Sequence, residues 1–421
     1  MPRATEAKLL LSATVLLAAA VVFFHLSGGR AAASATRVFA LAGGSYWAVH
    51  LLQYRCRPES DPLLLPLAAW MSLLGLIFLY RLDPELAARQ AVWVTLGLGG
   101  LAFFLVLPGY LVLAEYKYLG AGVALVLLAA TLLVGAKAGG AKSWLELGFL
   151  RFQPVEAVKL LMIVFLAGYL DEHRALLQTN WRQWGPIGLP VLHALLPLLA
   201  IWGLSLFLVA FQRDLGGALL LFGTLVAMLY LATGRALYLV AGFLLLAVGF
   251  AAGYYLFDHV RVRIQVWLDP WAQVHGAGYQ VVQGFFSLAA GGLWGTGLGL
   301  GQAHYVPAVA TDYLFVALAE EMGLAGALGL LSLYLLFTWR GFRLALNAAE
   351  SVGRLLAGGL TALFALQTLL ITGGVTGLLP LTGVTLPFFS YGGSATVVYY
   401  LLLGLLLQVS GHQSGRLEGG G

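Results

Sequence analysis

A few charged and amide side chains interrupt long apolar stretches of this chain, and they are the first candidates for chemistry. Glu156 and Lys159 begin one such stretch, just after Gln153. A carboxylate and an ammonium three residues apart share one face of a helix and can pair. Charges at membrane depth cost about 2.5–3.5 kcal/mol each and often mark a site. The pattern therefore fits either a simple ion pair or a polar site facing a cavity, to which Lys142 and Trp144 would add.

A second cluster surrounds Asp214, which opens another apolar stretch after Gln212 and Arg213. Aspartate is a favoured N-cap because its carboxylate accepts hydrogen bonds from the first N–H groups of a helix. Two interpretations stay open, a structural cap and a functional carboxylate, and one residue can serve as both.

A third cluster lies in the long connection 258–312 and just after it. Its candidate residues are Asp269, Gln273, Tyr279, Gln280, Asp312, Glu320 and Glu321. Glycines in such a loop let the backbone approach a ligand closely, whereas aromatic residues such as Trp271 and Tyr279 also suit a membrane interface. The apolar, glycine-rich middle, 281–301, is expected to be re-entrant or surface-lying rather than a span.

A fourth cluster, 383–394, contains Ser390 and Gly392 within a run rich in proline, aromatic residues and glycine. Irregular backbone beside membrane spans is tolerated only inside protein or along a wet cavity. The segment is therefore predicted to be buried or to line the site.

The amino-acid composition indicates that this protein is surrounded largely by lipid rather than by water. Of its 421 residues, 61% are hydrophobic and 10% are charged, and the mean hydropathy is +0.90. Soluble domains carry about 25% charged residues, so the chain is predicted to be an all-α, polytopic transmembrane helical bundle. The net charge of +5 then reflects basic loops rather than nucleic-acid binding. The single cysteine, Cys56, excludes an internal disulfide.

About twelve spans are predicted, with a weak second one. They are Leu9–Leu26, Val38–Leu52, Leu63–Tyr80, Ala91–Pro108, Leu119–Gly135, Val155–Leu170, Ile187–Ala210, Leu215–Leu231, Leu237–Phe257, Tyr313–Phe337, Leu355–Val375 and Ala395–Val409. The basic loop with Arg340, Arg343 and Arg354 is expected in the cytoplasm. All four clusters then face the extracytoplasmic side, as one cavity would require.

Several motifs occur together in an order that resembles the SEDS family of bacterial cell-wall polymerases, which includes RodA, FtsW and SpoVE proteins. They run from about Leu63 to Val409 and comprise Ala141-Lys142-Ser143-Trp144, Gln153-Pro154-Val155-Glu156, Gln212-Arg213-Asp214-Leu215-Gly216, Gly278-Tyr279-Gln280, Thr311-Asp312-Tyr313, Glu320-Glu321 and Leu386-Pro387-Phe388-Phe389-Ser390-Tyr391-Gly392-Gly393-Ser394. The family has ten spans. The resemblance thus implies extra N-terminal transmembrane helices in 1–62, a core in 63–410 with the extracytoplasmic loop 258–312, and a flexible tail in 411–421.

The resemblance implies a peptidoglycan glycosyltransferase that polymerises lipid II at the outer face of the bacterial cytoplasmic membrane, in cell-shape maintenance or cell division. Such a reaction needs a base for the attacking hydroxyl and positive charge for the leaving pyrophosphate. Lys142 and Lys159 could supply that charge. Glu156 and Asp214 could hold a divalent cation, Mg²⁺ or Mn²⁺, or orient the acceptor. The implied partner is a class B penicillin-binding protein.

The chain departs from the family pattern at the position of the aspartate held to be catalytic, which is Gln273 here. Glutamine cannot take a proton at neutral pH. Three explanations stay open: an introduced substitution, a different base such as Asp269 or Asp214, and a natural non-catalytic paralogue. Ser143, Arg213 and Ala310 are further departures from the family residues Arg, Pro and His.

Two alternatives to the enzyme remain. A lipid II flippase or other transporter would also place charges among many spans. A non-catalytic scaffold would keep the fold and activate a partner without the missing aspartate.

Overall fold

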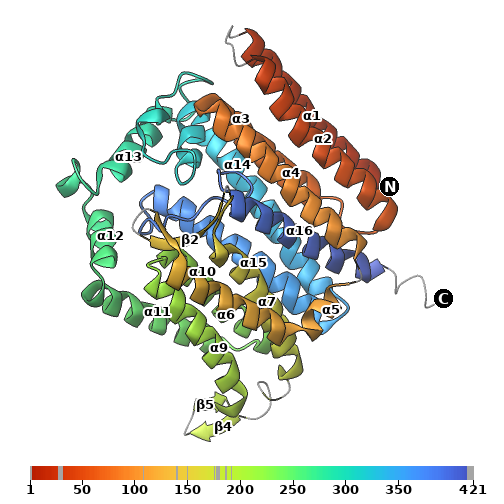
Figure 1. The fold of residues 1–421 in the computed structure, drawn as a ribbon, viewed down its shortest axis with the longest axis vertical. Coiled ribbons are helices and arrows are strands. Elements are labelled where there is room, and N and C mark those ends of the chain that lie inside the picture. The colour runs from red at the N-terminus through yellow and green to blue at the C-terminus, as the bar shows by residue number, and fades with distance from the viewer. Residues whose placement is uncertain are drawn as a thin grey trace. The chain divides into compact units, whose positions relative to one another are not determined.

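The structure is a computed structural model that describes residues 2–26, 32–107, 109–138, 141–148, 150–174, 176, 181–184, 187–190 and 192–414. It is an all-α polytopic fold with short strands in its loops (Figure 1). The chain divides into two compact units. The first comprises residues 1–107, 260–341 and 367–421, and the second comprises 108–259 and 342–366.

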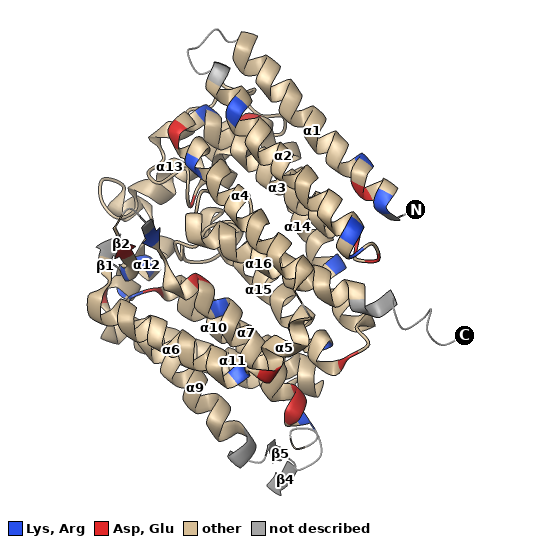
Figure 2. Cartoon of the chain, turned by 45° about the vertical axis from the view of Figure 1, so that its right-hand side comes forward, with Lys and Arg blue, Asp and Glu red and all other residues tan. Residues whose placement is uncertain are grey.

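The described residues contain nine helices that are long and apolar enough to cross a membrane. These are α1 (Pro2–Leu26), α3 (Leu64–Leu82), α4 (Pro84–Val106), α6 (Lys117–Val134), α10 (Leu215–Thr233), α11 (Leu237–Leu256), α14 (Leu314–Asn347), α15 (Ser351–Val375) and α16 (Gly393–Ser414). The protein is therefore a multi-pass membrane protein. Most of its charges lie toward the ends of these helices (Figure 2).

The other three predicted spans are also helical. They correspond to α2 (Ala32–Cys56), α7 (Pro154–Glu172) and α9 (Leu192–Phe211). The predicted start of the α9 span was wrong, because Ile187–Pro190 forms strand β5. The predicted tail also begins too early, since α16 continues to Ser414, whereas 415–421 lie outside the described residues.

In the first unit, α4 and α16 pack closely where the sequence places small residues. A methyl group at Gly100 would lie 2.7 Å from Leu401 Cδ2, and Gly97 faces the ring of Tyr400. The start of α4 is capped by Asp83, whose Oδ1 accepts hydrogen bonds from Glu85 N and Leu86 N at 2.9 and 3.0 Å. Gly97 and Gly100, one helical turn apart, thus let the two helices approach closely.

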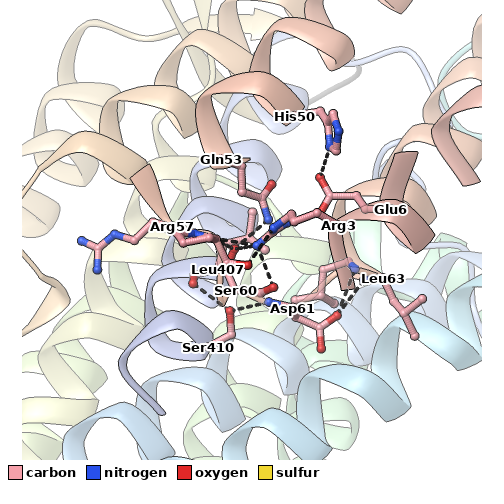
Figure 3. Close-up of polar contacts among 12 residues, drawn as sticks. Arg3, Glu6, His50, Gln53, Arg57, Ser60, Asp61, Leu63, Leu407 and Ser410 are labelled. Carbon is pink, nitrogen blue, oxygen red and sulfur yellow. Dashed lines mark hydrogen bonds and ion pairs between the residues drawn. The ribbon is translucent and has the colours of Figure 1, made fainter. Parts of the chain in front are cut away.

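The N-terminal pair α1 and α2 is joined to the rest of the first unit by buried polar groups (Figure 3). Glu6 is 0% exposed and pairs with both Arg3 and His50. Arg3 also donates to the carbonyl of Ser60 at 2.8 Å. Next to it, the backbone N–H of Asp61 donates to Ser410 Oγ at 3.0 Å, which brings in α16. We call Arg3, Glu6, His50, Ser60 and Asp61 the N-terminal network.

The first unit also contains the long connection predicted between residues 258 and 312, from residue 260 onward. It is built from α12 (Asp258–Leu268), the 3₁₀ turns η1 (Trp271–Gln273) and η2 (Ala303–Tyr305), and α13 (Tyr279–Gly291). With 13 residues, α13 is about 20 Å long, which is too short to cross a membrane. It is not a span, in agreement with the prediction.

The second unit adds strands to its helices. Strands β1 (Ala136–Ala138), β2 (Ala141–Leu147) and β3 (Leu150–Phe152) form an antiparallel sheet between α6 and α7 in sequence. Strands β4 (Trp181–Trp184) and β5 pair in antiparallel fashion, and α5 (Tyr110–Glu115) precedes α6. The unit is closely packed, since a methyl group at Gly359 of α15 would lie 2.5 Å from Met228 Sδ in α10.

Candidate functional site

The first part of the candidate site is the start of α7. Gln153 has extended backbone and Pro154 occupies the first helical position, where its missing N–H costs nothing. Within the first two turns of α7, Lys159 Nζ lies 2.8 Å from Glu156 Oε2. Glu156 is 6% exposed and Lys159 is 2% exposed. The predicted pair therefore exists and is buried, so each charge depends on the other.

Asp214 lies at the start of α10, which packs against the start of α7. Its Oδ1 accepts from Gly217 N at 2.8 Å, so the predicted N-cap is confirmed. A methyl group at Gly217 would lie 2.9 Å from Val155 Cγ2, the residue before Glu156. Among the described residues, Asp214 Oδ2 is buried without a hydrogen-bond partner. The cap thus leaves one carboxylate oxygen available for another contact.

Lys142 and Gln212 close the end of α6. Lys142 Nζ donates to the carbonyls of Leu132 and Leu133 at 2.7 and 2.8 Å. Gln212 Nε2 donates to Leu128 O, and Gln212 O accepts from Lys142 N, both at 2.9 Å. Carbonyls in the last turn of a helix have no partner within the helix. The ammonium of Lys142 therefore already has a structural role, and Trp144 is half-buried on the same strand.

The loop of the first unit holds Asp269 and Gln273. Asp269 Oδ1 accepts from the N–H groups of Trp271 and Ala272 at 3.2 Å each and shapes the turn η1. The backbone carbonyl of Gln273 accepts from Gly276 N and Gly278 N at 2.9 and 3.1 Å, and its side chain is half-buried. The turn that carries Gln273 is thus stabilised by backbone hydrogen bonds.

The helix α13 follows directly, and its first turn carries Tyr279 and Gln280. Gln280 Nε2 donates to Pro307 O at 2.8 Å, which links the two ends of the loop, while the Tyr279 side chain is exposed. A methyl group at Gly278 would lie 3.0 Å from Gln273 O, so glycine is needed where the turn meets the helix. Within the Gly-Tyr-Gln triplet, Gly278 therefore permits the turn before α13, and Gln280 connects α13 to Pro307.

Asp312 lies just before α14 and is linked electrostatically to Arg263 of α12. Burial raises the pKa of Asp312 above its ordinary value, while a hydrogen bond from Thr311 and the charge of Arg263 oppose the rise. Arg263 Nη1 donates to Thr382 O at 2.9 Å. Sequence reasoning missed Arg263. Its only signal was an arginine in a loop that holds few cations.

Glu320 and Glu321, in α14, bind the glycine-rich loop that follows α13, residues 292–302. Gln302 N donates to Glu320 Oε1 at 2.6 Å, and Gly299 N donates to Glu321 Oε2 at 3.0 Å. Arg81 pairs with Glu321 and donates to Gly301 O at 2.5 Å. Both adjacent carboxylates therefore have partners. Arg81 was missed because it ends a span far from Glu321 in the sequence.

Ser390 and Gly392 belong to an irregular buried segment of the first unit, as predicted. Gly392 N donates to Gln90 Oε1 at 3.3 Å, and Tyr391 N donates to Ala310 O at 2.9 Å. Ser390 is buried, and its Oγ has no hydrogen-bond partner among the described residues. Phe388, with φ of 63°, makes the sharp bend that this packing requires.

Comparisons with known proteins identify the family. Residues 63–415 match the model of the FtsW/RodA/SpoVE family, described as cell cycle protein. The chain belongs to this family. It is 40% identical over 380 residues to "Peptidoglycan glycosyltransferase RodA" of Mycobacterium tuberculosis, covering 87% of this chain and 81% of the relative. It is 34% identical over 338 residues to "Stage V sporulation protein E" of Bacillus subtilis, covering 79% and 89%.

Solved structures of SEDS proteins support the same assignment. A chain described under "Structural coordination of polymerization and crosslinking by a peptidoglycan synthase complex" matches with a TM-score of 0.70 and 30% identity, covering 84% of this chain and 98% of that one. The crystal structure of Thermus thermophilus rod shape determining protein RodA matches with a TM-score of 0.62, 31% identity and the same coverage. The helices α1 and α2 precede the stretch matched by the family model.

The SEDS candidate residues fall in two groups. Gln153, Glu156, Lys159, Asp214, Lys142 and Trp144 lie in the second unit, and Asp269, Gln273, Tyr279, Gln280, Asp312, Glu320, Ser390 and Gly392 lie in the first. Within the second unit the structure brings the starts of α7 and α10 together. Within the first, it links Asp312 to Arg263 in the middle of α12 and Glu320 to the glycine-rich loop.

One of the departures from the SEDS motifs coincides with an unusual backbone conformation. Arg213, where the family resemblance led us to expect proline, adopts φ of 64° two residues after the end of α9. Proline is fixed near −65° and cannot adopt this conformation. The turn into Asp214 therefore has a backbone geometry that the family proline would not permit.

Proposed function

We propose that this chain is a peptidoglycan glycosyltransferase that polymerises lipid II. The observation that carries this proposal is 40% identity to RodA proteins named as peptidoglycan glycosyltransferases, over 87% of this chain. In the reaction, a sugar hydroxyl of one lipid-linked disaccharide attacks the anomeric carbon of the other, and polyprenyl pyrophosphate leaves. The family motifs lie in the stretch that matches.

The residues of the second unit suit the leaving group. The Glu156–Lys159 pair places an ammonium in a buried site, where its interaction with a developing negative charge is strong. Magnesium is usually bound by one or two carboxylates together with substrate phosphates. Asp214 Oδ2, which has no hydrogen-bond partner among the described residues, fits this role, with Glu156 as the second candidate ligand, and the cation would stabilise charge on the pyrophosphate.

The residues of the first unit suit the acceptor and the base. Gln273 stands at the family aspartate position on a turn that its own backbone stabilises. Its carboxamide can orient a hydroxyl by hydrogen bonding but cannot remove the proton. Asp269 of this unit and Asp214 of the second unit remain the candidate bases in this chain, but Asp214 cannot act as the base while its Oδ2 binds a cation. Of the two, Asp269 already accepts two backbone hydrogen bonds, and Asp214 retains an oxygen without a partner among the described residues.

The test measures glycan polymerisation from lipid II by purified chain and its Gln273→Asp variant, each with its transpeptidase partner. Gln273→Asp should polymerise at least as fast as the unsubstituted chain, because it restores a base worth about 10²–10⁴-fold. Glu156→Gln provides a loss-of-function control. Absence of polymer from both the unsubstituted chain and the Gln273→Asp variant would refute the enzyme proposal.

A non-catalytic scaffold is the second candidate, and Gln273 is the observation that favours it. A scaffold would bind a class B penicillin-binding protein and stimulate its transpeptidase without making glycan. The same preparations distinguish the two functions. Transpeptidase stimulation without polymer from the unsubstituted chain, together with polymer from Gln273→Asp, identifies a scaffold derived from an enzyme.

We further propose that both termini and the end of α14 with Arg340 face the cytoplasm, and that the 258–312 loop faces outward. The partner is a class B penicillin-binding protein in a cell-shape or division complex. Cysteine labelling of intact cells tests the topology, with Cys56 replaced by serine. A cysteine at Gln280 should react with a membrane-impermeant maleimide, and one at Ala349 should not.

A further inference from the structure

A long apolar groove in the first unit is lined by α1, α3 and α14. Its larger part has a volume of about 720 Å³, with lining residues that include Leu9, Leu67, Trp70, Ala325, Gly329 and Trp339. A smaller part of about 180 Å³ continues from it, because Leu74 and Met322 line both. All three helices are candidate spans, so the groove opens where lipid is the solvent.

The dimensions of the larger part fit an acyl chain. Along α3 it runs from Leu63 to Leu74, which is about 17 Å at 1.5 Å per residue. This length is close to half of the roughly 30 Å hydrocarbon thickness, and thus to one leaflet. Beyond Leu74, the smaller part reaches the ion pair of Arg81 and Glu321.

Basic and aromatic groups lie at the opposite end of the groove. Lys8 is exposed and adjoins Leu9, while Arg340 adjoins Trp339 and lies 6.0 Å from its ring. Arg340 Nε donates to Asp61 at 2.5 Å, yet the side chain is still 26% exposed. A guanidinium has five N–H donors, so Arg340 can bind a phosphate as well. Tryptophan is common at the headgroup level of membrane proteins.

We propose that this groove is a binding site for an anionic phospholipid. One acyl chain fills the larger part, and the phosphate contacts Lys8 and Arg340 at its mouth. Because α1 lies outside the stretch matched by the family model, the site depends on a helix added to the family core. The bound lipid would fill the space between α1 and α14 and stabilise the attachment of the N-terminal pair.

Gly329 provides the direct test, because a methyl group there would have no heavy atom within 4 Å. Gly329→Leu should fill the groove without clashing with protein. The matched control is Gly99→Leu, since Gly99 is an exposed span glycine with equally open surroundings on α4 and is not a lining residue. Native mass spectrometry of the purified full chain, titrated with phosphatidylglycerol, reports the lipid bound to each variant.

We expect Gly329→Leu to weaken phosphatidylglycerol binding at least about tenfold, and Gly99→Leu to bind as the unsubstituted chain does. Lys8→Gln, which lies on the surface and cannot disrupt packing, should reduce the preference for phosphatidylglycerol over phosphatidylethanolamine. Equal binding by Gly329→Leu and Gly99→Leu would overturn the site. Stronger retention of polyprenyl phosphate than of phosphatidylglycerol would overturn the proposed occupant.

Discussion

The ion pair of Glu156 and Lys159 illustrates what single residues disclose in the sequence. Their spacing was enough to predict that they pair, because i and i+3 positions share a helix face. The cap at Asp214 was predictable for a similar reason, since it depends only on the residues that follow. Arg81 and Arg263 were not predictable, because their partners come from distant parts of the chain. Local geometry can be read from sequence, whereas long-range pairing requires the fold.

A double-mutant cycle decides whether the buried pair is only structural. Lys159→Met should lower the free energy of unfolding by about 3–5 kcal/mol, because it leaves Glu156 buried without its partner. Adding Glu156→Gln should recover most of this loss. Chemical denaturation or thermal melting in detergent measures both changes.

Polymerisation by the same variants separates the two interpretations of the pair. If Glu156 and Lys159 serve the reaction, the double variant should regain stability but remain inactive. An active and stable double variant would show that the pair only makes two charges tolerable.

Asp312 should make stability depend on pH. Burial raises its pKa in the folded protein, so the folded state binds the proton more tightly than the unfolded chain, whose Asp pKa is about 3.9. The free energy of unfolding should therefore fall as the pH rises from about 4 through the folded-state pKa.

Asp312→Asn should remove this contribution. Melting temperatures measured between pH 4 and 7 should decline less for Asp312→Asn than for the unsubstituted chain. Glu59→Gln, on the surface, controls for the loss of one negative charge. A parallel decline in Asp312→Asn and unsubstituted protein would contradict the assignment.

At the scale of elements, α14 departs most from what the sequence suggested. The prediction was an ordinary span beginning near Tyr313, and the observed helix is kinked at Gly323, with φ of 67°. The N–H groups of Leu324 and Ala325 donate instead to Gly292 and Leu293, at 2.9 and 3.2 Å. The local sequence Met322-Gly323-Leu324 does not predict that these N–H groups will donate to carbonyls outside the helix. The exchange arises because the glycine-rich loop supplies carbonyls to the second half of the helix.

Gly323→Ala should therefore be strongly destabilising. The added methyl would need a left-handed conformation and would lie 2.5 Å from Leu293 O. We expect a loss of more than about 1–2 kcal/mol, measured by thermal melting. Gly329→Ala in the same helix is the control, and it should be neutral or stabilising by up to about 1 kcal/mol, because its surroundings are open.

At the scale of the molecule, composition predicted the class of protein, and the motifs predicted the family. The placement of the N-terminal pair could not be predicted, because α1 and α2 carry no family motif. In the structure they belong to the first unit, joined to it by the N-terminal network. A buried carboxylate and its partners specify that attachment, whereas the apolar faces of α1 alone would permit many arrangements.

Glu6→Ala should loosen this attachment. It leaves Arg3 and His50 buried without their common partner, which should cost about 3–5 kcal/mol. Limited proteolysis in detergent should then cut the connection between α1 and α2 earlier than in the unsubstituted chain. Thr5→Ala, on the same helix but exposed and outside the lipid groove, should leave the cleavage rate unchanged.

The N-terminal network also has a consequence for biosynthesis. Asp61 hydrogen-bonds Ser410, which is 349 positions later in the chain. At translation rates of about 5–20 residues per second, these partners emerge roughly 20–70 s apart. Throughout that interval the backbone N–H of Asp61 lacks the Ser410 hydroxyl, and for most of it the Asp61 carboxylate lacks Arg340, which donates to it. The contact can form only after α16 has been synthesised, so a ribosome stalled before α16 leaves a chain in which the Asp61 carboxylate can already meet Arg340 but the junction of the N-terminal pair with α16 is still missing.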